Sequence, residues 1–480
     1  MKNMNPLVFI LSFLMAIVGL FMFFSFNEVS LLGHKMSFYS LNEVNEAFNK
    51  KKIKVKLQPD SSLLAKDNAS RSKLIEFPLL DEALVGNYID SLIQLNKLPI
   101  EESKIIESPY LINLPKDGKY PLDAFFKRLE TCNIGAIPLR VGHYGDSQIE
   151  GDRVTNLLRQ LFQKKFGGSG NGYIPMDDVT QPVGYIRKNT GSWQRHTVFK
   201  NTLSNNYYGP GGSTYTYSAD SNAATVSIQF FNSYNNLKIA YGKGYDNSTV
   251  KVFDQNSRKL LAEVSLNGTE YFQTQNLVKD AYCSRILLTF TGKSPYIYGL
   301  YADSQSGIQL DNYGMRGQSG DGLVRISLEQ LKSIFKQQNN ALSMLQFGGN
   351  VIPMVKNEKV LNTCGDSYKA LYLHFKQALT DGSVLVLGVN DLSRSVGGVY
   401  KSYDNISELR YLQRKYAVEN GLAFFDLYQF MGGNESIGLW SKKNLASKDG
   451  HLSEEGRIIL ANELYKALMF EYSQYLKRKK

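Results

Sequence analysis

Apolar strands alternate with amphipathic helices after residue 306, and this pattern constrains the fold more than any other feature of the sequence. The run 384–387 is apolar throughout, without the polar residue at every second position that a half-exposed strand shows. Such strands are typical of a parallel sheet that helices cover on both faces, so we expect an α/β fold of three layers. The predicted elements are helices at 328–338, 369–379, 406–419 and 457–476, and strands at 343–347, 384–387 and 422–426.

The same pattern occurs earlier in the chain, where it begins with a predicted strand at 136–141. The sequence Gly145-Asp146-Ser147 follows, and apolar residues then recur at helical spacing through 154–162. A serine at a strand-to-helix turn exposes both its hydroxyl and its own N–H, so attack on a carbonyl and stabilisation of the oxyanion occur at one point. The alternative interpretation is a turn in which the serine simply caps the helix.

Residues 175–305 differ from the α/β segments in composition and in hydrophobic pattern. Short runs rich in Val, Ile, Tyr, Phe and Thr are separated by Gly and Asn, which is typical of an antiparallel β-sandwich. Within this segment Asn267-Gly268 predicts a hairpin turn. The glycine-rich segment 167–172 precedes it and lacks the Gly-Lys-Ser/Thr ending of a phosphate-binding loop, so we expect a flexible loop there.

The β-rich segment interrupts the α/β pattern, so we expect one domain formed by 121–174 plus 306–480, with a sandwich at 175–305 inserted into it. The aromatic residues of the sandwich could form a carbohydrate-binding platform, because a tyrosine ring stacks while its hydroxyl makes hydrogen bonds. Packing within the sandwich accounts for the same residues equally well. The residues are Trp193, Tyr207, Tyr208, Tyr215 and Tyr217.

The N-terminal part carries a run of twenty residues without a charge, 7–26. A helix of this length spans the hydrocarbon core of a bilayer, so we expect a transmembrane anchor. Only Lys2 precedes the run and no small-x-small cleavage site follows it, which favours an uncleaved anchor over a cleaved signal peptide. Residues 27–120 mix polar segments with a helical period at 81–98, and we expect a stalk or lead-in region there.

The chain has a formal net charge of +11. A basic surface that faces an anionic polymer or a membrane is one interpretation, and ordinary solvated lysines are the other. The sequence has no zinc-finger spacing, RNA-binding aromatic motif or basic zipper, so we expect no nucleic-acid partner. Cys132, Cys283 and Cys364 are far apart and predict neither a disulfide framework nor a metal cluster. We therefore expect no metal and no cofactor.

Four short motifs occur in order along the two α/β segments. The first follows a predicted strand, the second is a glycine-rich turn before a helix, the third directly follows a strand, and the fourth precedes the last helix. Their order and placement resemble the SGNH (GDSL) hydrolase superfamily, over roughly residues 130–170 and 305–475. The motifs are Gly145-Asp146-Ser147, Tyr313-Gly314-Met315-Arg316-Gly317-Gln318-Ser319-Gly320-Asp321, Phe347-Gly348-Gly349-Asn350 and Asp449-Gly450-His451-Leu452-Ser453.

The resemblance implies a role for each motif. Ser147 would attack an ester carbonyl, His451 would accept its proton, and Asp449 would orient the imidazole. The N–H groups of Ser147 and Gly320 and the side-chain amide of Asn350 would hold the oxyanion. The sequence departs from the family pattern in the spacing of the acid and the histidine, because one residue rather than two separates them.

Alternatives stay open at three of these points. Gly317 lies in the same motif as Gly320, which we favour because it ends the Ser-Gly-Asp turn that opens the next helix. Asn390 also matches the third block, but Asn350 has the better spacing from the second block. His143 lies four residues before the serine, and it either contacts the site or is a buried histidine with satisfied partners.

A chain with these residues resembles cell-envelope O-acetylesterases, some of which carry a carbohydrate-binding-like sandwich in a comparable place. The resemblance implies a serine esterase that removes O-acetyl groups from an envelope glycan such as peptidoglycan, through an acyl-enzyme. Together with the predicted anchor at 7–26, it implies a single-pass protein of the bacterial inner membrane, with its catalytic domain in the periplasm or outside the cell. The alternatives are an O-acetyltransferase that uses a membrane acetyl donor protein, and a non-catalytic glycan-binding protein.

Overall fold

The computed structural model describes the chain over residues 29–31, 34–36, 82–100, 112–115, 118–218 and 224–480. The chain separates into two units, 1–57 and 58–480. In the first unit, β1 (Val29–Leu31) pairs antiparallel with β2 (His34–Met36). The predicted anchor at 7–26 lies outside the described residues, as does most of the predicted lead-in region. Within the described ranges, no helix combines the length and the apolar composition that crossing a membrane requires.

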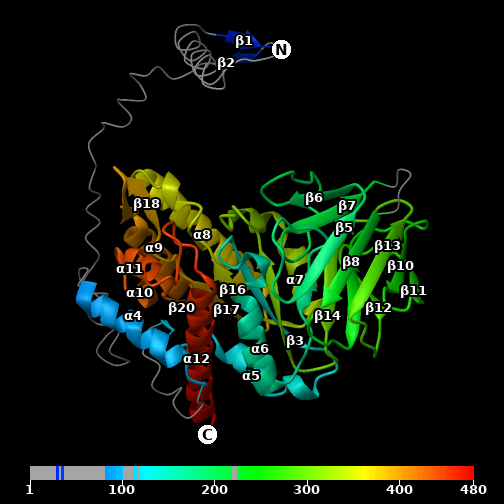
Figure 1. The fold of residues 1–480 in the computed structure, drawn as a ribbon, viewed down its shortest axis with the longest axis horizontal. Coiled ribbons are helices and arrows are strands. Elements are labelled where there is room, and N and C mark those ends of the chain that lie inside the picture. The colour runs from blue at the N-terminus through cyan, green and yellow to red at the C-terminus, as the bar shows by residue number, and fades with distance from the viewer. Residues whose placement is uncertain (1–28, 32–33, 37–81, 101–111, 116–117, 219–223) are drawn as a thin grey trace, which may run out of the picture. The chain divides into compact units, whose positions relative to one another are not determined.

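A five-stranded parallel sheet forms the centre of the second unit (Figure 1). In spatial order its strands are β15 (Ile308–Gly314), β3 (Leu139–Gly145), β16 (Asn340–Gln346), β17 (Ser383–Leu387) and β20 (Ala423–Phe425). All neighbouring pairs are parallel, as the apolar strands predict. The sequence pattern does not predict β15, because Gln309 and Asp311 interrupt its apolar run, yet both residues are fully buried.

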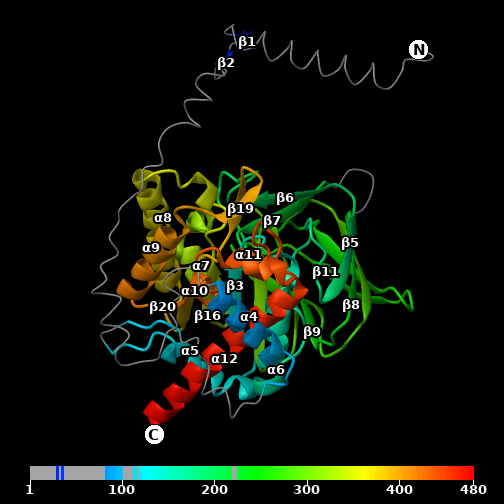
Figure 2. The same ribbon diagram turned by 60° about the vertical axis from the view of Figure 1, so that its left-hand side comes forward.

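Helices cover both faces of this sheet and give the three expected layers (Figures 1 and 2). They are α4 (Glu82–Asn96), α5 (Asp123–Leu129), α6 (Thr155–Phe166), α7 (Leu328–Gln337), α8 (Glu358–Ala378), α9 (Ile406–Glu419), α10 (Leu427–Met431), α11 (Ser436–Lys442) and α12 (Glu454–Lys479). In β17, Leu385 and Leu387 belong to one apolar cluster with α5, α6 and α12. Val384 and Val386 belong to a second cluster with α7, α8 and α9. Alternate side chains therefore enter two cores, which is why the strand has no polar face.

Two antiparallel sheets, formed between residues 172 and 303, pack around a third apolar cluster. In spatial order, the first contains β11 (Leu260–Ser265), β10 (Thr249–Asp254), β13 (Arg285–Thr291), β8 (Ala224–Phe230) and β5 (Tyr185–Thr190). The second contains β12 (Gln273–Val278), β9 (Asn236–Tyr241), β14 (Ile297–Asp303), β7 (Ser213–Tyr217) and β6 (Trp193–Thr197), with β4 (Gly172–Ile174) also paired to β14. In β8, buried and half-buried residues alternate, as they do in the strands of a β-sandwich.

Two local predictions for this region are wrong. Asn267-Gly268 does not form a hairpin, because β11 and β12 on either side of it belong to different sheets. The segment 167–172 is not a loose loop, since Asn171 is fully buried and a Cβ on Gly170 would lie 2.2 Å from a backbone oxygen of β14. The glycines here let two backbones approach each other closely.

A buried ion network joins the antiparallel sheets to the parallel sheet. Arg140 of β3 pairs with Asp303 at the end of β14 and with Asp311 of β15, and all three side chains are buried. The Arg140 guanidinium also lies 4.6 Å from the centre of the Tyr301 ring. Buried charges are tolerated only when they are paired and hydrogen-bonded, so this network fixes how the two regions meet.

Candidate active site

Ser147 lies two residues beyond the end of β3, at the carboxyl edge of the parallel sheet. The strand extends to Gly145 rather than ending at residue 141 as expected. A Cβ on Gly145 would lie 2.9 Å from the Ile149 side chain and 3.0 Å from the Gln346 carbonyl oxygen. Glycine at this position therefore lets the turn fold back against β16.

The turn does not lead directly into a helix, and in this detail the sequence prediction is wrong. The Asp146 carbonyl accepts hydrogen bonds from the N–H groups of Ile149 and Glu150, at 3.3 and 3.2 Å. A short 3-10 helix, Glu150–Asp152, comes next, and α6 begins only at Thr155. The N-cap of α6 is Val154, so Ser147 is not a cap for this helix. Its hydroxyl is available for another role.

Asp146 holds the shape of the turn from inside the protein. It is 3% exposed, and its carboxylate accepts from the Gln148 N–H at 2.9 Å and from the Asn350 side-chain amide at 3.1 Å. Burial raises the pKa of Asp146 to about 6, although the hydrogen bond from Gln148 acts in the opposite direction. The carboxylate beside the nucleophile candidate is therefore a structural group of the turn.

His451 is carried by a tight turn immediately before α12. The Gly450 N–H donates to the Ser447 carbonyl at 3.0 Å, and the Ser447 N–H donates to the His451 carbonyl at 2.8 Å. Gly450 has a φ of +100°, which favours glycine, and a Cβ there would lie 2.2 Å from Leu392. Ser453 then caps α12 by accepting from a backbone N–H of its first turn.

Ser147, His451 and Asp449 form a continuous chain of hydrogen bonds. The distance from Ser147 Oγ to His451 Nε2 is 2.8 Å, and that from His451 Nδ1 to Asp449 Oδ2 is 3.1 Å. With Nδ1–H donating to the carboxylate, Nε2 is free to accept from the serine hydroxyl. One residue between acid and histidine is thus enough spacing for the contact.

In this chain of hydrogen bonds, the acid Asp449 and the histidine His451 lie at the surface. The side chains of His451 and Asp449 are 42% and 63% exposed. Partial burial would raise the pKa of Asp449, but a hydrogen bond from Ser447 and the attraction of His451 outweigh it and hold the pKa below its usual value. Asp449 is therefore a charged acceptor at neutral pH.

Two buried amide side chains hold the histidine turn against the serine turn. Gln148 Nε2 donates to the Gly450 carbonyl at 3.0 Å, and Asn390 Nδ2 donates to the same carbonyl at 3.1 Å. In the sequence, Asn390 is only a second match to the third block. The structure instead places it after β17, under the loop that carries His451. The one sequence signal for the role of Gln148 is its position next to Ser147.

Asn350 and Gly320 lie where the second and third motifs follow β15 and β16. The Asn350 amide nitrogen donates to the Asp146 carboxylate and to the Gln318 carbonyl, the latter at 3.0 Å. Gly320 is buried with a φ of +95°, and a Cβ there would lie 2.8 Å from the Phe347 ring. Within the described residues, the N–H groups of Ser147 and Gly320 have no hydrogen-bond acceptor.

The other histidine near the site is a packing residue. His143 is fully buried, with Nδ1 2.9 Å from the Thr155 hydroxyl and Nε2 3.1 Å from the Gln346 side-chain oxygen. Burial lowers its pKa to about 4, so it is neutral at pH 7. Of the two interpretations left open, a buried histidine with satisfied partners is the one the structure supports.

The five aromatic residues of the antiparallel region do not share one exposed surface. Tyr208, Tyr215 and Tyr217 are buried. Trp193 packs edge-on against Tyr217, and Tyr207 packs against other tyrosines. In the part of the chain that is described, no cluster of three or more metal-ligating side chains occurs, and the three cysteines are free thiols.

The fold and the site together define the class of protein. The chain has an SGNH-type α/β fold with a Ser-His-Asp arrangement at the carboxyl edge of its parallel sheet, and it has an additional β-sandwich. The fold implied by the resemblance of the four motifs is thereby confirmed.

Solved structures resemble this chain to different extents. The chain is similar to a peptidoglycan O-acetylesterase, with 20% identity, a TM-score of 0.59, and coverage of 72% of this chain and 95% of that one. A lipase/acylhydrolase from Enterococcus faecalis matches 34% of this chain and 76% of its own, with 15% identity and a TM-score of 0.26. A mutant of a family 29 carbohydrate-binding module matches 28% of this chain and 95% of its own, with 16% identity and a TM-score of 0.20. No protein-family model and no curated protein matches the sequence.

Proposed function

We propose that this protein is a serine esterase that removes O-acetyl groups from a cell-envelope glycan such as peptidoglycan. The observation that carries the proposal is the chain of hydrogen bonds from Ser147 Oγ through His451 to Asp449. This arrangement activates a serine for attack on an ester carbonyl. The shared fold with a peptidoglycan O-acetylesterase supports the choice of substrate class.

In the proposed reaction, Ser147 Oγ attacks the acetyl carbonyl carbon. As the new O–C bond forms, the hydroxyl proton moves to His451 Nε2, and Asp449 stabilises the imidazolium through Nδ1. The imidazolium returns the proton to the sugar oxygen as the bond between that oxygen and the acetyl carbon breaks. Water, activated by the same histidine, then attacks the acetyl-serine, and acetate leaves with Ser147 restored.

The tetrahedral intermediates need donors for the negative oxygen. We assign this role to the N–H groups of Ser147 and Gly320 and to the amide of Asn350. The amide would exchange its hydrogen bond with Asp146 or Gln318 for one with the oxyanion. The two acceptors hold the amide nitrogen in place beforehand, so only one of its hydrogen bonds changes partner when charge develops.

The test is acetate release by the full chain and by Ser147→Ala. The substrates are an aryl acetate, O-acetylated peptidoglycan, and the same peptidoglycan after its esters have been removed with mild base. We expect serine-dependent release from the first two and none from the third. Release from the aryl acetate alone would keep the triad but exclude peptidoglycan, and faster turnover with added sugars would indicate transfer. Absence of serine-dependent release from any substrate would contradict the esterase.

The same proposal locates the protein at the cell envelope, with residues 7–26 as its anchor. The support is the absence of charge over a length that spans a bilayer. The full chain should sediment with membranes, whereas a chain that starts at residue 27 should not. External protease should degrade the full chain in cells whose outer layer has been removed. Protection in such cells would contradict a catalytic domain that lies in the periplasm or outside the cell.

A further inference from the structure

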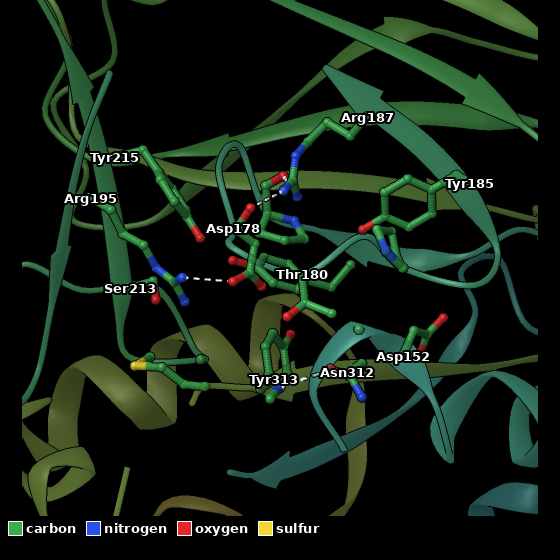
Figure 3. A pocket seen from close by; sticks show the side chains of 17 residues that line it. Asp152, Asp178, Thr180, Tyr185, Arg187, Arg195, Ser213, Tyr215, Asn312 and Tyr313 are labelled. Atoms are coloured by element: carbon green, nitrogen blue, oxygen red, sulfur yellow. Dashed lines mark hydrogen bonds and ion pairs between the residues drawn. The ribbon is translucent and has the colours of Figure 1, made fainter. Parts of the chain in front are cut away.

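A small cavity lies between the turn that follows Ser147 and the antiparallel sheets (Figure 3). Gly151 and Asp152, in the 3-10 helix that follows this turn, line one side together with the end of β15, and β5, β6 and β7 line the other. Its volume is about 30 Å³. That is room for about two water molecules, or for one carboxylate group but not a whole sugar ring.

Arg195 of β6 presents an unused donor to this cavity. Its Nη1 pairs with Asp178 at 2.9 Å, whereas its Nε is buried and has no hydrogen-bond partner among the described residues. The edge of a guanidinium that contains Nε binds a carboxylate through two parallel hydrogen bonds. A buried donor without an acceptor is unfavourable, so an acceptor from outside the chain would satisfy it.

Tyr215 of β7 presents a second unused donor. The residue is fully buried, and its hydroxyl has no hydrogen-bond partner among the described residues. The neighbouring Tyr173 hydroxyl already donates to the Tyr298 carbonyl at 3.0 Å. Burial raises the pKa of Tyr215, so the hydroxyl stays protonated and can donate. Figure 3 shows Tyr215 and Arg195 reaching into the cavity from the same side.

The cavity also carries excess positive charge. Arg187 of β5 is 3% exposed, and its guanidinium donates to the backbone carbonyls of Pro175 and Asp178, at 3.0 and 3.1 Å. Asp152 on the opposite wall is already neutralised by Arg159. Since the Asp178 carboxylate pairs with Arg195, the Arg187 charge has no carboxylate of its own in the described part of the chain.

The cavity is tied to the serine turn. Thr180, on its wall, accepts from Arg316 at 3.2 Å, and Arg316 pairs with Glu150 at 2.9 Å. The Glu150 N–H in turn binds the Asp146 carbonyl beside Ser147. A group held in the cavity is therefore held relative to the nucleophile.

We propose that this cavity binds a carboxylate group of an acidic glycan, with Arg195 and Tyr215 as its donors and the Arg187 charge beside them. The proposal rests on the proposed function in one respect, since it takes the glycan to be the esterase substrate. The carboxylate would be the part of the sugar that sets which ester reaches Ser147. The lactyl ether of an N-acetylmuramic acid residue that carries no peptide supplies this group, and so does a uronic acid. The experiment distinguishes the two.

The test measures binding of two matched pairs of sugars to the full chain by titration calorimetry. N-acetylmuramic acid differs from N-acetylglucosamine by a lactyl ether, and a methyl glucuronide differs from the methyl glucoside by its carboxylate. One acidic member should bind at least about tenfold more tightly than its neutral partner, because hydrogen bonds to charged groups are the strong ones. The pair that shows the preference identifies the source.

Variants then separate recognition from folding. Tyr215→Phe and Arg195→Lys should lose most of the preference, and Tyr215→Phe should keep its melting temperature because the deleted hydroxyl has no partner. The matched control is Tyr217→Phe in the same strand, whose hydroxyl donates to the Thr291 carbonyl at 3.1 Å. It should lower the melting temperature and keep the preference.

Equal binding of acidic and neutral sugars, or no binding of either, would overturn the proposal. So would a preference that survives both Tyr215→Phe and Arg195→Lys. Turnover of an aryl acetate by the unmodified chain is measured alongside, because this substrate has no carboxylate. A preference for the acid without any ester turnover would contradict the esterase and leave the carboxylate site standing.

Discussion

The turn that carries Ser147 and the loop that carries His451 are built in opposite ways. The serine turn is internal, since Asp146 is 3% exposed and both its carboxylate oxygens accept hydrogen bonds. The histidine loop lies at the surface, where the side chains of His451 and Asp449 are 42% and 63% exposed. The parallel sheet positions the first, and a short turn before the last helix positions the second.

The link between the two is the Gly450 carbonyl, which accepts from Gln148 on one side and Asn390 on the other. The histidine loop therefore takes its position from the serine turn and from the end of β17. Water screens interactions at the exposed loop far more than in the buried turn. Changes in the loop should mainly alter catalysis, whereas changes in the turn should alter folding as well.

The largest expected effect comes from removing either reacting group. Ser147→Ala and His451→Ala should each lower kcat on an aryl acetate by roughly 10⁶-fold, since the two act as one unit. For the same reason the double variant should be no slower than either single variant. Ser333→Ala, on the exposed side of α7, is the control for serine loss. Losses that multiply in the double variant would mean that the two residues do not act together.

The exposure of the acid predicts a milder effect at Asp449. Asp449→Asn should lower kcat by roughly 10² to 10³-fold, less than the ~10⁴-fold seen when the acid of a buried triad is changed, because water also stabilises the imidazolium here. Ser447→Ala removes the hydroxyl that helps to lower the Asp449 pKa, and should cost less. A loss of 10⁴-fold or more would show that the loop closes over the acid when substrate binds.

Substitutions of Asn350 and Asn390 should lower kcat by different amounts if the two residues belong to different halves of the site. Asn350→Ala should lower kcat by roughly 10² to 10³-fold with little change in KM, as expected for a lost oxyanion donor. Asn390→Ala should lower kcat by only about tenfold, because it removes one of two donors to the Gly450 carbonyl. The reverse ranking would assign the third block to Asn390.

The link itself can be tested with Gln148. Gln148→Ala should lower kcat by about tenfold, the cost of one hydrogen bond to the loop. Combined with Asn390→Ala, it leaves the Gly450 carbonyl without either side-chain donor, so the combined loss should exceed the product of the single losses. A strictly multiplicative result would mean that the two amides act independently of the loop position.

The sequence predicts those parts of the fold and of the site that depend on local sequence pattern. β17 and α9 follow from unbroken apolar character and helical period, and the order of the motifs predicts Ser147 and His451 as site residues, whose side chains lie 2.8 Å apart. The parts that depend on distant partners are not predictable. The strand β15 cannot be recognised in the sequence, because its buried Asp311 is paired with Arg140. The role of Gln148 cannot be recognised either, because its hydrogen-bond partner lies 302 residues away.

Asp391 offers the smallest and most selective test, because it adjoins Asn390 but, among the described residues, has no hydrogen bond to Ser147, Asp449 or His451. Its buried carboxylate accepts from Ser402 and from the Ile437 N–H, at 2.9 and 3.0 Å, and so ties α11 and the β19 strand (Val399–Ser402) to the end of β17. Burial raises the pKa of Asp391 to about 7, although the hydrogen bond from Ile437 opposes the rise. Between about pH 4 and 7 the folded state thus binds a proton that the unfolded state does not.

The free energy of unfolding should therefore fall as pH rises through this window, by about 2 kcal/mol from pH 5 to 7 on account of Asp391. In denaturant unfolding, the free energy of unfolding of Asp391→Asn should fall by about 2 kcal/mol less between pH 5 and 7 than that of the unmodified chain. Asp404→Asn, an exposed carboxyl that pairs with Arg394, is the matched control and should keep the slope of the unmodified chain. An unchanged slope in Asp391→Asn would mean that this carboxyl is ionised in the folded state at pH 5. The support beneath the histidine loop would then be a charged group, and the contrast between a buried neutral carboxyl and the exposed charged Asp449 would not hold.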